Sequence, residues 1–439
     1  MYGSAYFYVV SCTFCFLYSV KMKKILFFIL SVLIFSACSD EIPEDKVLKR
    51  NGRTLLAYLV SNNNSGSLDK YLKNNLVDMY KGLASTNDSS ALVVYYRPYD
   101  NDASLEHPSL LTFVSDGKGN VNGMKALSGT DLTSENVIGA AHVISYTEDN
   151  HVATSPEVMK RVLGDMIKLV PSKSYGLIFG SHGSSWIEGN SYKGRAFGDD
   201  NGYNIDIPDM AQAIDEAFVN STLDFILFDA CMMETAEVCY ELKDVTDYII
   251  GAVVETHVYG HPYDVILPKL LQNNVPYSDI CDEYISYSRK KGAWGTCAVV
   301  DCSKMDDLAS WIGNNLQNYN EKLNSDFVYD VQQYGVETFS YSFKYFSLDI
   351  VDFFRKLNDG TVPDGLQNLM DEVVIAKACL SGTGYEVVGV LPISEEQFCG
   401  IGMYYPYRFG KTNWDNYFES SISWYKAVGW QNYKEAITE

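Results

Sequence analysis

The chain has 439 residues, 47% of them hydrophobic, and a formal net charge of −22 at pH 7. This apolar content is enough for a large core and for two or three domains. The acidic balance leaves no basic patch for a nucleic acid, which excludes nucleic-acid binding as a function class. An acidic surface repels anionic partners and attracts cationic ones.

The first 38 residues have the pattern of a targeting segment. Lys23 and Lys24 precede an apolar run at 25–35, and small residues then lead to Cys38. The run is too short for a stable membrane span and fits a signal peptide with Met22 as initiator. Its end resembles the lipobox of bacterial lipoproteins. The resemblance implies an exported protein, anchored by a lipid on Cys38 to the periplasmic or cell-surface side of a membrane. Ordinary secretory cleavage is the alternative.

Beyond a polar tether at 39–53, strand and helix patterns alternate as far as residue 302. The apolar runs are short, as in buried parallel strands. This alternation predicts one α/β domain over 54–302 with right-handed strand–helix–strand units. The predicted strands are 54–60, 91–96, 110–114, 175–180, 223–231, 248–254 and 296–300, the predicted helices are 68–80, 156–169, 205–219 and 232–242, and a long loop is predicted over 183–204.

The last part of the chain, 303–439, has a different pattern and is expected to form a smaller α+β extension packed on the first domain. Helical patterns lie at 303–323, 347–357 and 413–428, and a strand pair lies near 385–391 and 400–405. The predicted fold class is therefore α/β, with a mostly parallel sheet flanked by helices and an α+β extension at the C-terminus.

Two of the predicted strands end in residues that can carry chemistry. One ends at Cys231, where a helical pattern begins, and another ends just before His182. The carboxyl ends of parallel strands share one edge of the sheet, which is where open α/β folds place ligand sites. A helix N-terminus would favour the Cys231 thiolate, and His182 could protonate a leaving group. The sequence thus predicts a cysteine nucleophile with a histidine partner.

Neighbouring residues extend this hypothesis. The backbone amides of Gly183 and Cys231 are natural donors to an oxyanion, because a glycine lets the chain approach a substrate closely. Asp229 lies on the same strand face as Cys231, since side chains alternate along a strand. It either lines a pocket for a basic side chain or bonds to backbone near the turn. His257 and His261 are alternative bases, or a metal pair without an evident third ligand.

These segments closely resemble the clostripain-like cysteine peptidases (peptidase family C11), in the clan of caspases, gingipains, separases and legumain. The family has an apolar strand ending in His-Gly-Ser-Gly-Trp and another ending in Asp-Ala-Cys-x-Met, followed by Glu-Val and Tyr-Glu-Leu. The corresponding residues here are 182–186, 229–233 and 237–242, and the likeness covers about 54–430.

The resemblance implies a caspase-like catalytic domain and endopeptidase action after Arg or Lys, with His182 and Cys231 as the catalytic dyad. It also implies that Asp229, Glu255 and Thr256 border the substrate pocket. The chain departs from the family at two places: Ser185 replaces the second glycine of the His motif, and the loop at 255–263 lacks the usual Pro-Gly and Trp. The second departure leaves the Arg/Lys preference open.

Further expectations concern activation, cofactors and partners. Family members are often activated by cleavage after the His motif, and here Lys193 and Arg195 are possible self-cleavage sites. No metal or other cofactor is expected, although some members need calcium, which Asp199, Asp200 and Asp206 could bind. We expect a monomer that acts on peptide or protein substrates. The alternatives are a catalytically silent surface lipoprotein that binds peptide or a surface component, and a transpeptidase or ligase.

Overall fold

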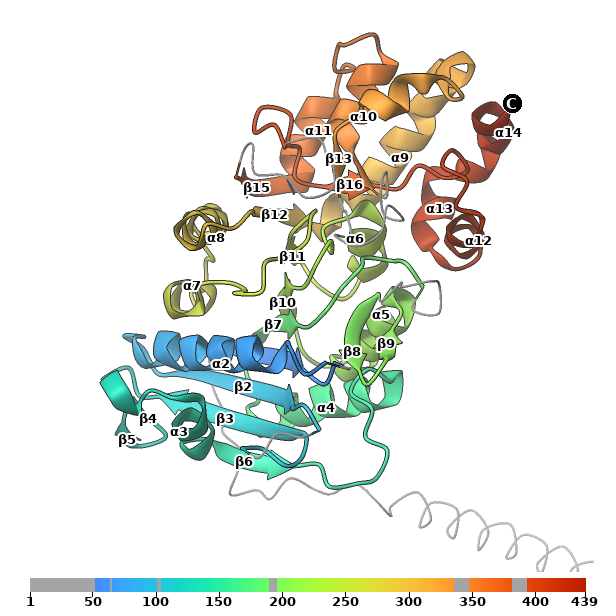
Figure 1. Ribbon diagram of the computed structural model, residues 1–439. Coiled ribbons are helices and arrows are strands. Elements are labelled where there is room, and N and C mark those ends of the chain that lie inside the picture. Colours follow the sequence, from blue (N-terminus) through green and yellow to red (C-terminus); the bar gives the residue numbers. More distant parts are fainter. Residues whose placement is uncertain (1–51, 64, 101–103, 189–195, 335–346, 381–392) are drawn as a thin grey trace, which may run out of the picture. The chain divides into compact units, whose positions relative to one another are not determined.

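A mixed sheet of eleven strands is the centre of the fold in the computed structural model (Figure 1). The structure describes residues 52–63, 65–100, 104–188, 196–334, 347–380 and 393–439, all within one unit that spans 48–439. The main path of the sheet runs in the order β15 (Val374–Cys379), β12 (Thr296–Asp301), β11 (Tyr248–Gly251), β10 (Leu223–Asp229), β7 (Ser174–Gly180), β1 (Arg53–Val60), β2 (Ser90–Arg97), β3 (Ser109–Ser115), β4 (Asn120–Val121) and β5 (Met124–Lys125), while β6 (His142–Ser145) pairs with β3.

The five central strands, β11, β10, β7, β1 and β2, are parallel to one another, as the apolar runs predicted. The outer strands β12, β15 and β3 are antiparallel. The mostly parallel core confirms the predicted α/β fold class. It also aligns the carboxyl ends of β1, β7 and β10 along one edge of the sheet, where the candidate site lies.

Helices cover both faces of this sheet (Figure 1). On one face lie α2 (Asp69–Ala84), α7 (Tyr263–Leu270) and α8 (Tyr277–Lys291), and on the other lie α4 (Pro156–Leu169), α5 (Ile207–Ala217) and α6 (Ala236–Leu242). The short helix α3 (Ser134–Gly139) packs near α2. The start of α4 is the predicted one, because the Ser155 side chain caps the helix by accepting from the Val158 amide.

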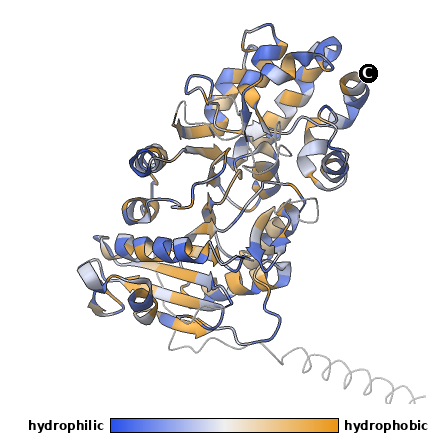
Figure 2. Ribbon diagram, viewed as in Figure 1, coloured by the Kyte–Doolittle hydropathy of each residue, from blue (hydrophilic) through white to orange (hydrophobic). Residues whose placement is uncertain are grey.

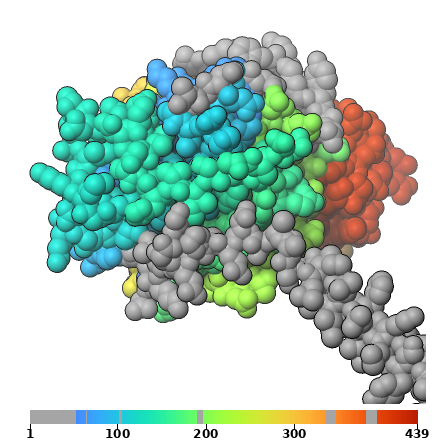
Figure 3. All heavy atoms as spheres, turned by 90° about the horizontal axis from the view of Figure 1, so that it is seen from below, coloured from blue at the N-terminus to red at the C-terminus, as the bar shows by residue number. Residues whose placement is uncertain are grey.

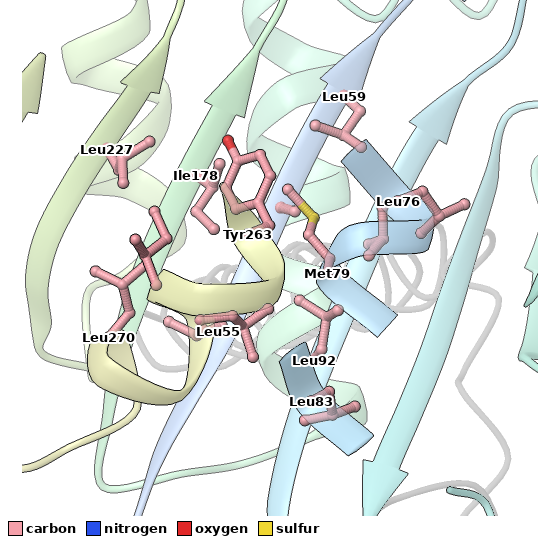
Figure 4. Packing of buried hydrophobic residues seen from close by; sticks show 14 of the residues in the cluster. Leu55, Leu59, Leu76, Met79, Leu83, Leu92, Ile178, Leu227, Tyr263 and Leu270 are labelled. Carbon is pink, nitrogen blue, oxygen red and sulfur yellow. The ribbon is translucent and has the colours of Figure 1, made fainter. Parts of the chain in front are cut away.

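The core under α2 and α7 is built from the alternate side chains of the central strands (Figure 4). Leu55, Ile178 and Leu227 come from three neighbouring strands and pack against Met79 of α2 and Leu270 of α7. Figure 2 shows the corresponding pattern, with apolar strands inside and hydrophilic helix surfaces outside. This packing fixes the elements that carry the candidate site.

The C-terminal part adds helices and a small sheet of β13, β14 and β16. Figure 3 shows the C-terminal residues (red) at one side of the view, next to residues coloured green. The predicted helix over 413–428 is two helices, because Ile422 is extended (φ −96°, ψ 119°). The elements are α9 (Met305–Leu316), β13 (Gln333–Tyr334), β14 (Ser347–Asp349), α10 (Ile350–Leu357), α11 (Leu366–Val373), β16 (Gly402–Met403), α12 (Thr412–Ser421), α13 (Ser423–Val428) and α14 (Lys434–Thr438).

The structure differs from several of the elements predicted from the sequence. The predicted loop over 183–204 contains a hairpin of β8 (Phe197–Asp200) and β9 (Tyr203–Ile205). β15 comes from beyond residue 302 yet completes an edge of the central sheet, and the domain boundary at 302 stays a prediction. The predicted strand at 385–391 lies outside the described residues. Among the helices that the structure describes, none is both long and apolar enough to cross a bilayer.

Candidate active site

The register of two neighbouring strands brings the predicted nucleophile and base to the same place. β7 and β10 are parallel, and Gly180 pairs with Asp229. His182 and Cys231 each follow two residues later, so they leave adjacent strands at the same edge. The chains touch there: a Cβ added to Gly183 would lie 2.9 Å from the Cys231 carbonyl oxygen. Only glycine allows this approach, so the structure brings the two predicted segments together.

Cys231 as a residue is partly exposed, and its thiol faces the loop at 255–263. Its Sγ donates to the Thr256 carbonyl oxygen at a distance of 3.8 Å. Burial of the thiol, with the nearby Glu255 carboxylate, raises the pKa of Cys231 to about 12. The resting form is therefore a neutral thiol, which needs a base before it can act as a nucleophile.

The prediction of a helix directly after Cys231 is wrong. The helix begins at Ala236, where Thr235 caps it by accepting from the Val238 amide. The intervening residues are tied to the chain after β11 instead, because the Met232 amide donates to the carbonyl of Val254 at 3.0 Å. No helix N-terminus therefore adjoins the thiol, and the expected stabilisation of the thiolate by a helix dipole is wrong.

His182 has a polar neighbour that the sequence did not reveal. Asn63 Nδ2 lies 3.2 Å from His182 Nε2. Asn63 is 95% buried, and its Oδ1 makes no hydrogen bond to a described residue. It follows β1, which is the neighbour of β7, so both residues sit at the same edge. A polar residue in a loop gives no periodic signal, and only the order of the strands identifies it.

Asp229 lies on the predicted face but under the chain. Its Oδ2 accepts from Tyr263 Oη at 2.9 Å and from Asn75 Nδ2 at 3.2 Å, and Figure 4 shows the Tyr263 hydroxyl directed toward the arrowhead ends of the strands. Burial raises the pKa of Asp229 to about 6. Gly260 closes over it (φ +65°), and a Cβ there would collide with Asp229 and Asn75. The carboxylate is thus covered and bonded within the protein.

The two other residues implied for the substrate pocket lie in the segment that faces the thiol. Thr256 Oγ1 donates to the Ala230 carbonyl at 3.0 Å, which holds the loop against the turn before Cys231. The Glu255 carbonyl accepts from Trp294 Nε1 at 2.7 Å. The segment of Glu255 and Thr256 therefore borders Cys231 and is held in place by backbone contacts, and the role of both residues in substrate binding stays a prediction.

The rival histidines belong to the core. His257 and His261 lie 5.3 and 4.4 Å from the ring centroid of Tyr284, and His257 Nε2 is 2.8 Å from Ser288 Oγ. Burial lowers the pKa of His257 to about 4 and that of His261 to about 3. Both are buried, neutral residues of the loop that pack on Tyr284. Among the described residues, no group of three or more His, Cys, Asp or Glu side chains could hold a metal ion.

Asp199 and Asp200, two of the three acidic residues considered for calcium, are bonded within the protein. Asp200 is 98% buried and forms an ion pair with Arg97, at 3.0 Å between Nη2 and Oδ1. It also accepts from the Asn62 side chain and the Ala153 amide, each at 2.7 Å. Asp199 accepts from the Gly202 amide at 2.8 Å. The protein itself satisfies the carboxylate that a calcium ion would need.

The two residues after Ser184 explain how the His182 segment is held. Ser185 has φ +58°, the conformation in which the family has glycine, and its Oγ lies 2.6 Å from Thr235 Oγ1. Trp186 is fully buried, with its ring centroid 5.0 Å from that of Tyr404 and 5.0 Å from that of Phe418. The predicted sites Lys193, Arg195 and Cys38 lie outside the described residues.

Comparisons with known proteins agree with this architecture. The sequence model of the clostripain family, peptidase C11, matches residues 57–435. A secreted C11 cysteine protease from Bacteroides thetaiotaomicron, in complex with an irreversible peptide inhibitor, is 24% identical with a TM-score of 0.65, and the match covers 87% of this chain and 100% of that one. An inactive zymogen C11 protease from Parabacteroides distasonis is 23% identical with a TM-score of 0.64, over 88% and 99% of the two chains.

No curated protein sequence matches the chain. The two solved structures share its fold, which confirms the predicted caspase-like sheet. The family match spans most of the sequence and includes both strand ends at which His182 and Cys231 lie. The chain therefore belongs to the clostripain family of cysteine peptidases.

Proposed function

We propose that the protein is an endopeptidase that hydrolyses peptide bonds with Cys231 as nucleophile and His182 as base and acid, after Arg or Lys. The observation that carries the proposal is the register of β7 and β10, which puts both residues at one strand edge with Gly183 against the Cys231 carbonyl. Within the described part of the chain, the Gly183 and Cys231 amides donate to no other residue, so both are available to an oxyanion.

The steps follow from a neutral thiol. Because the pKa of Cys231 is raised to about 12, its proton passes to His182 as Sγ attacks the scissile carbonyl carbon. The carbon–nitrogen bond then breaks, and His182 returns the proton to the leaving amine. Water gives a proton to His182 and attacks the thioester, which releases the acid product, and the proton returns to Cys231.

The dyad is tested by cleavage of an unfolded protein such as β-casein, with the purified chain lacking residues 1–38. We expect Cys231→Ala and His182→Ala each to lower the rate by at least about 10³-fold. The exposed His142→Ala variant serves as a control and should keep the wild-type rate. Equal cleavage by wild type and Cys231→Ala would refute the proposal.

The proposal includes activation by self-cleavage. Its support is the presence of Lys193 and Arg195 between the described residues Glu188 and Ala196, soon after the His motif. On incubation, the wild-type chain should separate into two fragments, whereas Cys231→Ala and a Lys193→Ala/Arg195→Ala double variant should stay intact. A wild-type chain that remains intact while it cleaves casein argues against this step.

We also propose export as a membrane-anchored lipoprotein. The support is the short apolar run at 25–35, which precedes Cys38 and follows two lysines. In the bacterial host, the protein should carry a lipid-modified N-terminal Cys38 by mass spectrometry, and Cys38→Ser should leave the membrane fraction. An unmodified N-terminus on the exported wild type would contradict the anchor.

A silent binding protein of the same fold is the second candidate. It is favoured by the protonated thiol, which donates to the Thr256 carbonyl, and by the covered Asp229. Alkylation with iodoacetamide separates the two. A peptidase should lose activity as Cys231 is modified, whereas a binding protein shows no turnover and an unreactive Cys231 but still retains peptides.

A further inference from the structure

The strand β8 runs beside the turn that carries His182. The Gly198 amide donates to the His182 carbonyl at 2.9 Å, and the Ser184 amide donates to the Ala196 carbonyl at 3.2 Å. These two bonds lie on either side of the turn's centre and run in opposite directions, as in an antiparallel pair. The position of β8 therefore sets the backbone of His182.

Asp200, the last residue of β8, accepts hydrogen bonds from three other parts of the chain. It is buried, and its Oδ1 accepts from Asn62 Nδ2, just after β1, at 2.7 Å. Its Oδ2 accepts from the Ala153 amide, before α4, at 2.7 Å. Arg97 at the end of β2 supplies the countercharge, with Nε 3.0 Å from Oδ1. Because a buried carboxylate is costly without such partners, Asp200 ties β8 firmly to these three segments.

Asn62 connects this carboxylate to the ring of His182. Its own carbonyl accepts from the Asn201 amide at 2.7 Å, so its side chain and its backbone both hold the turn between β8 and β9. The next residue is Asn63, whose Nδ2 lies 3.2 Å from His182 Nε2. Asp200 is thus linked to the backbone of His182 through β8, and to its ring through the stretch of Asn62 and Asn63.

We propose that Asp200 is a positioning residue for the proposed dyad, and that it holds His182 where the ring can take the proton of Cys231. The inference rests on the proposed peptidase function and adds a residue that acts through His182. The carboxylate is required because its three partners are all donors, and an amide in its place would turn an N–H group toward another N–H group. Proton transfer needs hydrogen-bond distance, so a small displacement of His182 slows the chemical step more than it weakens substrate binding.

Steady-state kinetics test this role with a matched control. The full-length chain is assayed with a fluorogenic peptide taken from its main cleavage site in β-casein. Asp200→Asn should lower kcat about tenfold, with KM unchanged within about twofold. The control is Asp224→Asn, which breaks another largely buried ion pair, with Arg53 Nε at 2.6 Å, at the opposite end of the same sheet. The control should keep the wild-type kcat, although urea denaturation should show a loss of stability in both variants.

A milder variant keeps the inference testable if Asp200→Asn does not fold. Asn62→Ala retains the ion pair of Asp200 with Arg97 and removes the side-chain bond between Asp200 and the end of β1. It should lower kcat about threefold with KM unchanged, which corresponds to the loss of one hydrogen bond. A wild-type kcat in folded Asn62→Ala would overturn the link through the end of β1.

Histidine NMR observes the ring itself and needs no turnover. The full-length Cys231→Ala protein is prepared with isotope-labelled histidine, and the His182 signal is identified by its loss when His182→Ala is added. The chemical shift of the His182 ring should move in both test variants and stay in the Asp224→Asn control. The signal of the exposed His142 should stay in all of them.

The outcomes separate the positioning role from the peptidase function. A wild-type kcat in Asp200→Asn, or an equal loss of kcat in Asp224→Asn, overturns the positioning role and leaves the peptidase intact. A His182 signal that moves in neither test variant also overturns it. If wild type cleaves nothing while the His182 signal responds to Asp200→Asn and not to Asp224→Asn, the proposed peptidase function fails and the link from Asp200 to His182 stands.

Discussion

At the scale of single residues, the candidate site must move a proton from Cys231 to His182. A thiol with a pKa of about 12 needs a neutral imidazole next to it. Asn63 Nδ2 lies 3.2 Å from His182 Nε2, and in this orientation Nε2 accepts and the neutral ring carries its proton on Nδ1. If the amide turns over, its Oδ1, which bonds to no other described residue, can accept from a protonated ring. With Oδ1 facing the ring, Nε2 keeps its proton and Nδ1 is left to take the thiol proton, so this orientation of Asn63 suits both the neutral and the protonated form of His182.

This geometry predicts that Asn63 positions His182. Asn63→Ala should lower kcat by about tenfold with little change in KM, because the substrate contacts remain. Asn63→Asp should move the acidic limb of the kcat/KM pH profile to higher pH, since a carboxylate beside an imidazole favours its charged form. Parallel pH profiles of wild type and both variants check this. If the acidic limb of the pH profile is not shifted in Asn63→Asp, Asn63 has only a packing role.

At the scale of an element, the loop at 255–263 covers Asp229 and is anchored by two buried histidines. His257 and His261 pack on Tyr284, and Gly260 closes over Asp229. The loop meets the thiol through the Thr256 carbonyl. Its core residues are therefore coupled to the site, and their protonation affects the loop as a whole.

The buried His261 of this loop predicts that the protein becomes less stable in acid. The folded-state pKa of His261, about 3, lies below its unfolded value of about 6.5. The stability from neutral His261 is fully present above about pH 6.5 and is lost as pH falls toward about 3. Between pH 7.5 and pH 5, the free energy of unfolding of wild type should fall by about 2 kcal/mol more than that of His261→Phe. The figure comes from about 1.5 pH units, between about 6.5 and 5, at about 1.4 kcal/mol per unit.

Urea denaturation of both proteins at the two pH values measures this difference. Comparison with the variant is needed because Asp229 has the opposite sign: its pKa of about 6 is raised, so its contribution is lost as pH rises from about 4 to about 6. The variant His142→Gln, at an exposed residue, is the control, and its free energy of unfolding should depend on pH as that of wild type does. A His261→Phe protein with wild-type pH dependence would show that His261 titrates normally.

The sequence could reveal those features that local patterns encode. Buried parallel strands are continuous apolar runs, so β7 and β10 were found, and their common edge placed His182 near Cys231. The start of α6 was missed because residues 232–234 are held by hydrogen bonds to the chain after β11. Asn63 and the bonds that cover Asp229 depend on which elements are neighbours in space, which no local pattern states.

At the scale of the whole molecule, the C-terminal part braces the two segments of the candidate site. The Gly402 amide donates to the Glu234 carbonyl at 3.3 Å, and the Tyr404 amide donates to Glu237 Oε1 at 2.8 Å. The Tyr404 ring packs on Trp186 of the His182 segment. One short stretch thus supports both the chain after Cys231 and the chain after His182, although it lies beyond the predicted domain boundary at 302.

This brace predicts that the two predicted domains unfold together. Tyr404 is 99% buried, so Tyr404→Ala should cost about 3–5 kcal/mol of unfolding free energy, which is typical for a deleted buried aromatic ring. It should also lower peptidase activity, because Trp186 loses its support. Tyr203→Ala, at a residue that is 62% exposed, should change little. Chemical denaturation followed by tryptophan fluorescence and by activity should give one shared transition for each protein. Two separate transitions, with activity retained after the first, would instead make 54–302 an independent catalytic domain.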